Sequence, residues 1–174
     1  MHATNKILLF LLGFCSLCLV AFFNNSCNIY KFRDISIPDS IKTVKVGFFD
    51  NKAPYVNPQL SPRLADKLRQ KIVSQTRLSQ TNNDNADWDI TGTVTDYSFS
   101  TSGISNQQSS SNRISVAVHI ILNDQKAGKM NEYDISRNFD FSSTQSLQQA
   151  EASLLEEMLR GLSDDIFNRI FSNW

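Results

Sequence analysis

The segment RISVAVHIIL, residues 113–122, carries the clearest strand pattern in the chain, and the fold class follows from it. Its apolar side chains recur at every second position, which places them on one face of a strand: Ile114, Val116, Val118, Ile120 and Leu122. After a turn around Gly128, residues 132–141 alternate in the same way, with an apolar row made of Tyr133, Ile135, Phe139 and Phe141. Two strands joined by a short turn predict an antiparallel hairpin.

Two more alternating segments precede this hairpin. Residues 43–49, TVKVGFF, predict a first strand with Val44, Val46 and Phe48 on its apolar side. Residues 87–99 predict a second strand, whose apolar side holds Trp88, Ile90 and Val94. The following segment, STSGISNQQSSSN, residues 100–112, is rich in serine and asparagine without an apolar row, so we expect a mobile surface loop there.

Two helices complete the pattern. The first is predicted over residues 60–76, with Ser61 as its N-cap and Pro62 at its first position. The second begins after Ser146, where Gln149 is placed to close a capping box. Its apolar rows pass Gly161 without a change of phase, which predicts one long helix: Leu154, Met158, Leu162, Ile166, Ile170 and Trp174, beside Leu155, Leu159, Phe167 and Phe171.

The order strand, helix, three strands, helix predicts an α+β fold. Each predicted element has one apolar face, so we expect a two-layer sandwich in which two helices pack on one face of a four-stranded, mainly antiparallel sheet. The single domain is expected to span residues 41–174. A signal peptide, residues 1–26, and a lead-in, residues 27–40, precede it.

The leader is typical of exported proteins. A short polar start is followed by an uncharged apolar run over residues 7–23, which is typical of a secretory signal and also approaches the length of a membrane span. If the leader is cleaved, Cys15 and Cys18 leave with it, and Cys27 becomes the sole cysteine. A disulfide within the mature chain is then impossible.

We therefore expect cleavage before Cys27 and attachment of lipid to its sulfur, with the small residue Ser26 just upstream. More than one acyl chain would be needed, because a single chain anchors a protein only marginally. Asn24 departs from the aliphatic residue that such signals usually carry three positions before the cysteine. An uncleaved membrane helix, and a buried or intermolecular thiol, remain as alternatives.

The composition offers little reactive chemistry. Lysine plus arginine and aspartate plus glutamate number 17 each, so no global charge favours nucleic acid. Beyond the leader, one histidine, His119, and one cysteine cannot form a conventional zinc site, and no metal, cofactor or catalytic residue is predicted. The aspartate pairs at 87 and 89 and at 164 and 165 could serve acid–base chemistry, but solvated carboxylates are the favoured interpretation.

Basic side chains are the candidates for ligand binding. They cluster along the first predicted helix and at the hairpin tip, where they could engage lipid phosphates: Arg63, Lys67, Lys71, Arg77, Lys126 and Lys129. An ordinary solvated surface is the competing interpretation.

Several short motifs are similar to those of one family. They cover nearly the whole mature chain: CNIYKF (27–32), SIP (36–38), FFDNKAPYVNPQLS (48–61), GTVTDY (92–97), NRI (112–114) and DIFNRIFSNW (165–174). On these motifs the chain resembles the lipopolysaccharide (LPS)-assembly lipoprotein family, LptE, in the form found in Bacteroidetes. The family fold, two helices on a four-stranded sheet, agrees with the fold predicted above.

The resemblance implies a non-enzymatic outer-membrane lipoprotein on the periplasmic side, anchored through an acylated cysteine that Cys27 matches. Its implied partner is the large β-barrel translocon LptD, which it would partly plug while helping LPS reach the cell surface. The outward strand positions, mainly Thr, Ser, Asn and Asp, suit a polar barrel lumen. The alternative is a periplasmic lipid-binding or lipid-shuttling lipoprotein that acts without a barrel.

Overall fold

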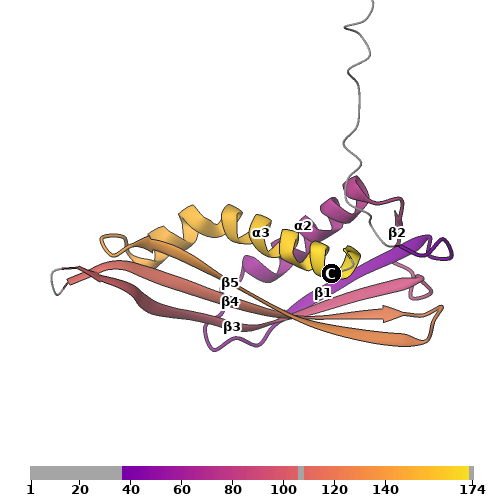
Figure 1. Cartoon of the computed structure of the whole chain (residues 1–174), viewed down its shortest axis with the longest axis horizontal. Helices are drawn as coiled ribbons and strands as arrows, with labels where there is room; N and C mark the ends of the chain where they lie inside the picture. The colour runs from indigo at the N-terminus through magenta and orange to yellow at the C-terminus, as the bar shows by residue number, and fades with distance from the viewer. Residues whose placement is uncertain (1–36, 106–107, 173–174) are drawn as a thin grey trace, which may run out of the picture. The chain divides into compact units, whose positions relative to one another are not determined.

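The computed structural model describes residues 37–105 and 108–172. Its elements follow in the order β1 (Thr43–Asn51), α2 (Leu60–Gln75), β2 (Ser79–Gln80), β3 (Trp88–Ser105), β4 (Gln108–Asp124), β5 (Lys129–Ser142) and α3 (Leu147–Phe171). Figure 1 shows α2 and α3 on the same side of the sheet, which confirms the α+β class and its two layers. The cysteine and leader predictions lie outside the described residues.

The sheet differs from the predicted one in strand number and direction. It has five strands in the order β2-β1-β3-β4-β5, and β1 pairs in parallel with both β2 and β3. The prediction of four mainly antiparallel strands was therefore imprecise. Because the chain returns from β1 through α2 before it enters β3, these two neighbours run in the same direction. β2 has only two residues, too few to show an alternating pattern.

The prediction of a surface loop at residues 100–112 was wrong. Residues 100–105 and 108–112 instead continue β3 and β4 as paired strands, from Thr101 opposite Asn112 to Ser105 opposite Gln108, with register shifts at Gly103. Backbone hydrogen bonds hold such a ladder without an apolar row, so composition alone misses it. We call residues 100–105 and 108–112 the arm; Figure 1 shows it extending beyond the helices.

The core lies between the helices and the inner face of the sheet, where it includes every member of the predicted row Ile114 to Leu122. The first strand is in phase only to Val46, because the pairing with β3 shifts between Val46 and Phe49. Phe49 therefore enters the core with 0% exposure, whereas Phe48, the predicted core residue, is 70% exposed. A Cβ at Gly92 would lie 2.7 Å from the Phe49 ring, so only glycine fits there.

The start of α3 was predicted correctly, and the start of α2 was not. The capping box of α3 is confirmed, since the backbone N–H of Ser146 donates to the Gln149 side chain at 3.0 Å and the backbone N–H of Gln149 donates to the Ser146 hydroxyl at 3.3 Å. α2 instead begins at Leu60 with Gln59 as its N-cap, and Ser61 is buried in the first turn.

α3 runs unbroken through Gly161, as predicted, and its apolar rows are buried or partly buried up to Phe171. Trp174 lies outside the described residues. Gly161 leaves room for the guanidinium of Arg137, which comes from β5 and lies 3.0 Å from Asp165. An added Cβ would meet that guanidinium, so the glycine makes room for an ion pair between sheet and helix.

Candidate functional site

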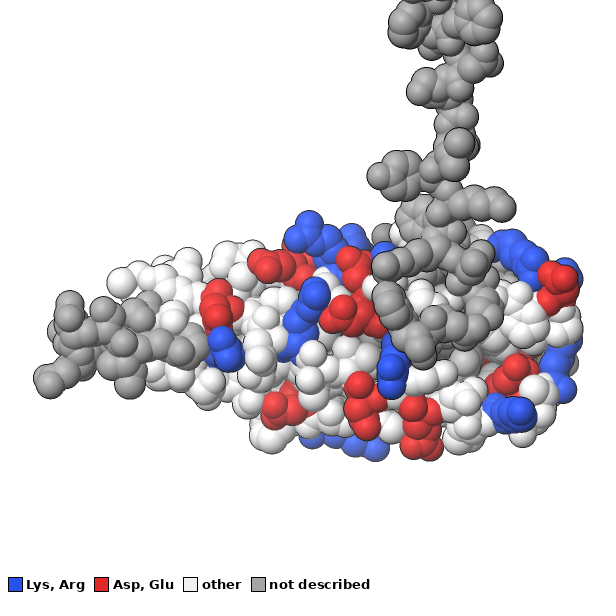
Figure 2. Space-filling model, in the orientation of Figure 1, with Lys and Arg blue, Asp and Glu red and all other residues white. Residues whose placement is uncertain are grey.

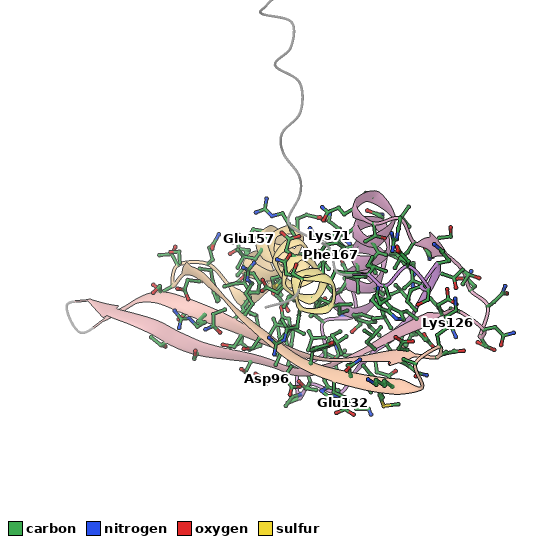
Figure 3. The ribbon with its side chains drawn as sticks, turned by 45° about the vertical axis from the view of Figure 1, so that its right-hand side comes forward. Lys71, Asp96, Lys126, Glu132, Glu157 and Phe167 are labelled. Carbon is green, nitrogen blue, oxygen red and sulfur yellow. The ribbon has the colours of Figure 1, made fainter. Side chains whose placement is uncertain are left out.

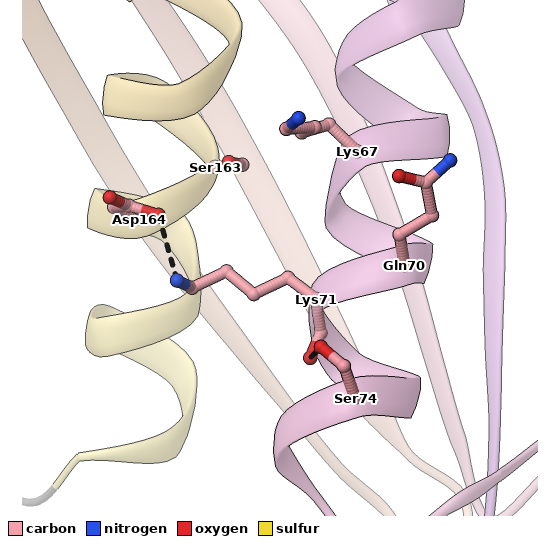
Figure 4. A pocket seen from close by; sticks show the side chains of 6 residues that line it. All are labelled: Lys67, Gln70, Lys71, Ser74, Ser163 and Asp164. Carbon is pink, nitrogen blue, oxygen red and sulfur yellow. Dashed lines mark hydrogen bonds and ion pairs between the residues drawn. The ribbon is translucent and has the colours of Figure 1, made fainter.

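Two of the predicted basic residues meet at a groove between the helices. Lys67 and Lys71 of α2 line it together with Asp164 of α3, and its volume is about 370 Å³ (Figure 4). The Lys71 ammonium lies 2.7 Å from the Asp164 carboxylate and 5.2 Å from the centre of the Phe167 ring. Within residues 37–105 and 108–172, Lys67 makes no ion pair or hydrogen bond.

Arg63 and Arg77 do not join this groove. Arg63, one turn before Lys67, pairs with Glu156 of α3. Arg77 lies beyond the end of α2, where it pairs with Asp39 at 2.7 Å and donates to the carbonyl of Ile37. The first helix therefore offers one uncompensated cation, Lys67, between two ion pairs that join it to α3.

The hairpin-tip lysines lie at the opposite end of the sheet from the arm. Lys126 is 3.0 Å from Asp87, and it also donates to the carbonyl of Ser40. Lys129 begins β5 and is exposed. Asp87 also accepts the backbone N–H groups of Lys42 at 2.6 Å and of Thr43 at 2.9 Å.

Those backbone donors stabilise the ionised carboxylate, so the pKa of Asp87 is lowered well below its ordinary value. Asp87 thus ties the start of β1 to the start of β3, whereas Asp89 lies 3.8 Å from Lys45. The two aspartates do not form the paired acid–base site considered from the sequence. Asp164 and Asp165 do not form such a site either, because Asp164 pairs with Lys71 and Asp165 pairs with Arg137.

His119 lies on the uncovered face of the sheet, because it is out of phase with the buried row from Ile114 to Leu122. Its Nδ1 is 2.8 Å from Asp134, and its Nε2 is 3.6 Å from Glu132 on the same strand. The neighbouring residue on β3 is Thr93. Among the described residues, no group of three His, Cys, Asp or Glu side chains could hold a metal ion.

One polar cluster was not predicted from the sequence. The carboxylate of Glu151, in the first turns of α3, accepts hydrogen bonds from Tyr97 at 2.9 Å, Tyr55 at 3.1 Å and Asn57 at 3.1 Å. Burial, followed by the bond to Glu151, raises the pKa of the Tyr97 hydroxyl, and the same causes raise that of Tyr55. The cluster holds the loop before α2 against α3 and β3, next to the arm.

The aromatic rings around this cluster extend onto the surface. Tyr55 packs against Tyr97 and Phe99, with ring centres 5.5 and 5.2 Å apart. Phe99 also lines a groove of about 360 Å³ at the base of the arm, together with Phe141 and Leu147. Alternation along β3 places Tyr97 on the outer face, and it is the pairing shift between Val94 and Asp96 that turns it inward, so no sequence signal indicates its position.

These features define a small α+β domain with a filled core, paired surface charges and open grooves on its surface. Neither of the helices in the described part of the chain has the length and hydropathy of a membrane span. The chain belongs to the LptE family, because the family model described as lipopolysaccharide-assembly matches residues 41–170. Membership assigns it a general role in LPS assembly.

Solved structures match this chain at low sequence identity, and the match with a TM-score above 0.5 shows a similar fold. Protein XCC0632 from Xanthomonas campestris matches with a TM-score of 0.54 and 8% identity, over 79% of this chain and 89% of that chain. A minor lipoprotein from Acinetobacter baumannii matches with a TM-score of 0.47 and 11% identity, over 75% and 93%. Rare lipoprotein B from Shewanella oneidensis gives 0.39 and 14%, over 72% and 92%. No curated protein matches the sequence.

Proposed function

We propose that this protein is a non-enzymatic, lipid-anchored accessory subunit of an LptD-like β-barrel, on the periplasmic side of the outer membrane. In this role it assists assembly of the barrel and insertion of LPS at the cell surface. The observation that carries the proposal is the family match over residues 41–170, which covers both helices and the sheet almost completely.

The uncovered face of the sheet supports a position inside a hydrated partner. Hydroxyls, amides and charged groups lie along three neighbouring strands of this face, among them Thr93, Ser115, His119, Asp134 and Asn138, beside the apolar Ala117, Ile121 and Met130. Such a face loses little hydration in a polar barrel lumen. Figure 2 likewise shows positive and negative residues interspersed on the visible surface, with no large field of one sign.

Copurification tests the partnership. The full-length protein, tagged and expressed in its own host, is extracted from outer membranes with a mild detergent and captured, and its partners are identified by mass spectrometry. We expect a large β-barrel protein in near-equal amount. Recovery of the protein only as a free monomer would contradict the proposal.

The proposed anchor is tested at Cys27. We expect Cys27→Ala to leave the precursor unprocessed in the inner membrane, because the thioether that carries the lipid cannot form. The checks are the mass of the mature N-terminus and the membrane fraction that holds the protein. Ser26→Ala, which keeps a small residue before the cysteine, is the matched control and should be processed.

We propose that Lys67 makes the main contact with the phosphate groups of LPS and that Lys71 lies beside this contact. Arg63, Arg77, Lys126 and Lys129 would contribute long-range attraction. A charge-assisted hydrogen bond to phosphate suits the unpaired ammonium of Lys67 better than an arginine already engaged by a carboxylate. We expect Lys67→Gln to weaken LPS binding several-fold, whereas Lys52→Gln, on the exposed loop after β1, should leave it unchanged.

The second candidate is a lipid-binding protein that acts without a barrel. It is favoured by the groove at the base of the arm, where Phe99, Phe141 and Leu147 offer apolar surface to an acyl chain. Binding of a fluorescent fatty acid to the isolated full-length protein, abolished by Leu147→Asp, would support this candidate. If such binding is absent and a barrel is recovered in the copurification, the result would support the accessory subunit of a β-barrel instead.

A further inference from the structure

The two edges of the sheet are built differently. At one edge, β2 covers only the start of β1, and Arg69 of α2 donates two hydrogen bonds of 3.3 Å to the carbonyl of Val46 further along. At the other edge, β5 pairs with β4 over its whole length without a register shift, and no described strand pairs with its outer side. A long, regular and uncovered edge is a template for pairing with another strand.

A groove follows this open edge. It has a volume of about 490 Å³, and its walls are Asp134, Ile135 and Ser136 of β5 and Asp165, Asn168 and Arg169 of α3. The three helix residues share one face, because they are spaced by three and four positions. Figure 1 shows β5 at the border of the sheet beside α3, so the groove has a strand edge on one side and a helix on the other.

We propose that this groove binds an extended, basic segment of a partner protein by β-strand addition to β5. Main-chain hydrogen bonds to the β5 edge would provide affinity, and alternate side chains of the added strand would meet α3 on one side and the uncovered sheet face on the other. The inference goes beyond the proposed function, because it requires neither a barrel nor LPS.

The charges beside the edge favour a basic occupant. On the uncovered face, the outward positions of β5 carry the carboxylates of Glu132, Asp134 and Asp140 and no lysine or arginine. Arg113 of β4 pairs with Asp140, whereas Glu132 and Asp134 have only His119 beside them. On the helix side, burial raises the pKa of Asp165 despite the guanidinium of Arg137 at 3.0 Å. Arg169 also lines the groove on the helix side, so an additional cation is favoured on the uncovered face of the added strand and not beside α3.

The same charges disfavour a second copy of this chain as the occupant. In antiparallel pairing of two β5 strands, the acidic rows of both copies would lie on the same face, where like charges destabilise cross-strand neighbours. A strand with lysine or arginine at alternate positions removes this repulsion.

Peptide binding to the full-length protein in detergent micelles tests the charge preference. The probe is a fluorescent heptapeptide that alternates lysine and valine, with blocked ends, and a glutamate–valine peptide is its counterpart. We expect the basic probe to bind at least about tenfold more tightly, and Asp134→Lys to weaken it by about tenfold. Glu157→Lys makes the same kind of charge reversal on the exposed side of α3 (Figure 3) and should have no effect. Equal loss in both variants would overturn the proposal.

Backbone methylation of the probe separates strand addition from simple charge attraction. Two versions are methylated on the amide nitrogens of odd or of even residues, so only one version loses the donors that face β5. We expect one version to lose binding and the other to keep it, with slower amide exchange along β5. Equal binding of both versions would overturn the proposal, as would a dimer in sedimentation that the basic probe dissociates, because the occupant would then be a second copy.

Discussion

The two faces of the sheet share one backbone ladder and differ in almost every other respect. On the covered face, the inward residues of β4 are at most 4% exposed and pack against the two helices. On the uncovered face, the same strand presents Arg113, Ser115 and His119, which meet carboxylates of β5 or solvent. The difference indicates that side chains on the covered face contribute most of the folding stability. Side chains on the uncovered face are therefore free to change with the partner that they contact.

Neighbouring isoleucines on β4 give the sharpest test of this asymmetry. Ile120 is fully buried on the covered face, whereas Ile121 is only half-buried on the other. We expect Ile120→Ala to lower the free energy of unfolding by about 2–5 kcal/mol, because it removes buried methyl groups and leaves a cavity. Ile121→Ala should cost less than about 1 kcal/mol. Urea unfolding of both variants measures the difference, and equal losses would show that the uncovered face also carries the core.

The Glu151 cluster tests whether the covered side also depends on polar contacts. Glu151→Ala removes the acceptor of three donors and leaves the buried Tyr97 hydroxyl without its partner. We expect a loss of about 1–3 kcal/mol in the free energy of unfolding, with faster amide exchange in the loop before α2. Glu157→Ala, on the exposed side of the same helix, is the matched control and should change little. A neutral Glu151→Ala would mean that aromatic packing alone holds the loop.

Asp87 adds a pH dependence at the end of the sheet away from the arm. Its folded-state pKa is lowered from the ordinary value of 3.8, so the ionised carboxylate stabilises the fold above pH 3.8, and this stabilisation is lost as the pH falls through the folded-state pKa. We expect Asp87→Asn to be less stable than the native chain at pH 7 and the difference to shrink below pH 3.8. Thermal unfolding across this pH range measures it.

The control for Asp87 is Asp39→Asn, since the side chain of Asp39 is 92% exposed. It should follow the pH dependence of the native chain. A stability difference between Asp87→Asn and the native chain that stays constant down to pH 2 would contradict the proposed contribution of the carboxylate.

The sequence predicted the covered face well because burial imposes a period on it. The row from Ile114 to Leu122 and the long helix through Gly161 were both confirmed. Prediction failed where that period does not apply. The pairing shift in β1 places Phe49 in the core instead of Phe48, and the sequence cannot indicate this because both residues are phenylalanine. The arm is held by backbone hydrogen bonds, which require no apolar pattern in the sequence.

The candidate site was predicted in part for similar reasons. Helical spacing alone brought Lys67 and Lys71 together, since they lie one turn apart on α2. The Glu151 cluster could not be predicted, because Glu151 lies 54 residues from Tyr97 and 96 residues from Tyr55 in the chain. Contacts of that separation depend on how the helices sit on the sheet, which no local pattern encodes.

The smallest expected effect belongs to the uncovered face. His119→Ala removes the contacts of the imidazole with Asp134, whose side chain is 89% exposed, and with Glu132, whose side chain is 59% exposed. Exposed pairs contribute little, so we expect a change of less than about 0.5 kcal/mol in the free energy of unfolding at pH 7. Urea unfolding beside Ile120→Ala provides the comparison on a single strand.

The same variant also tests what the uncovered face is for. If this face contacts a partner, His119→Ala should alter complex formation while stability stays the same, because the imidazole lies between the carboxylates that a partner would meet. Quantitative copurification from mild detergent measures this effect, and Thr93→Ala on the neighbouring strand gives a second position on the same surface. Loss of stability without loss of the partner would reverse the assignment of the two faces, because it would place a structural role on the side that the helices leave uncovered.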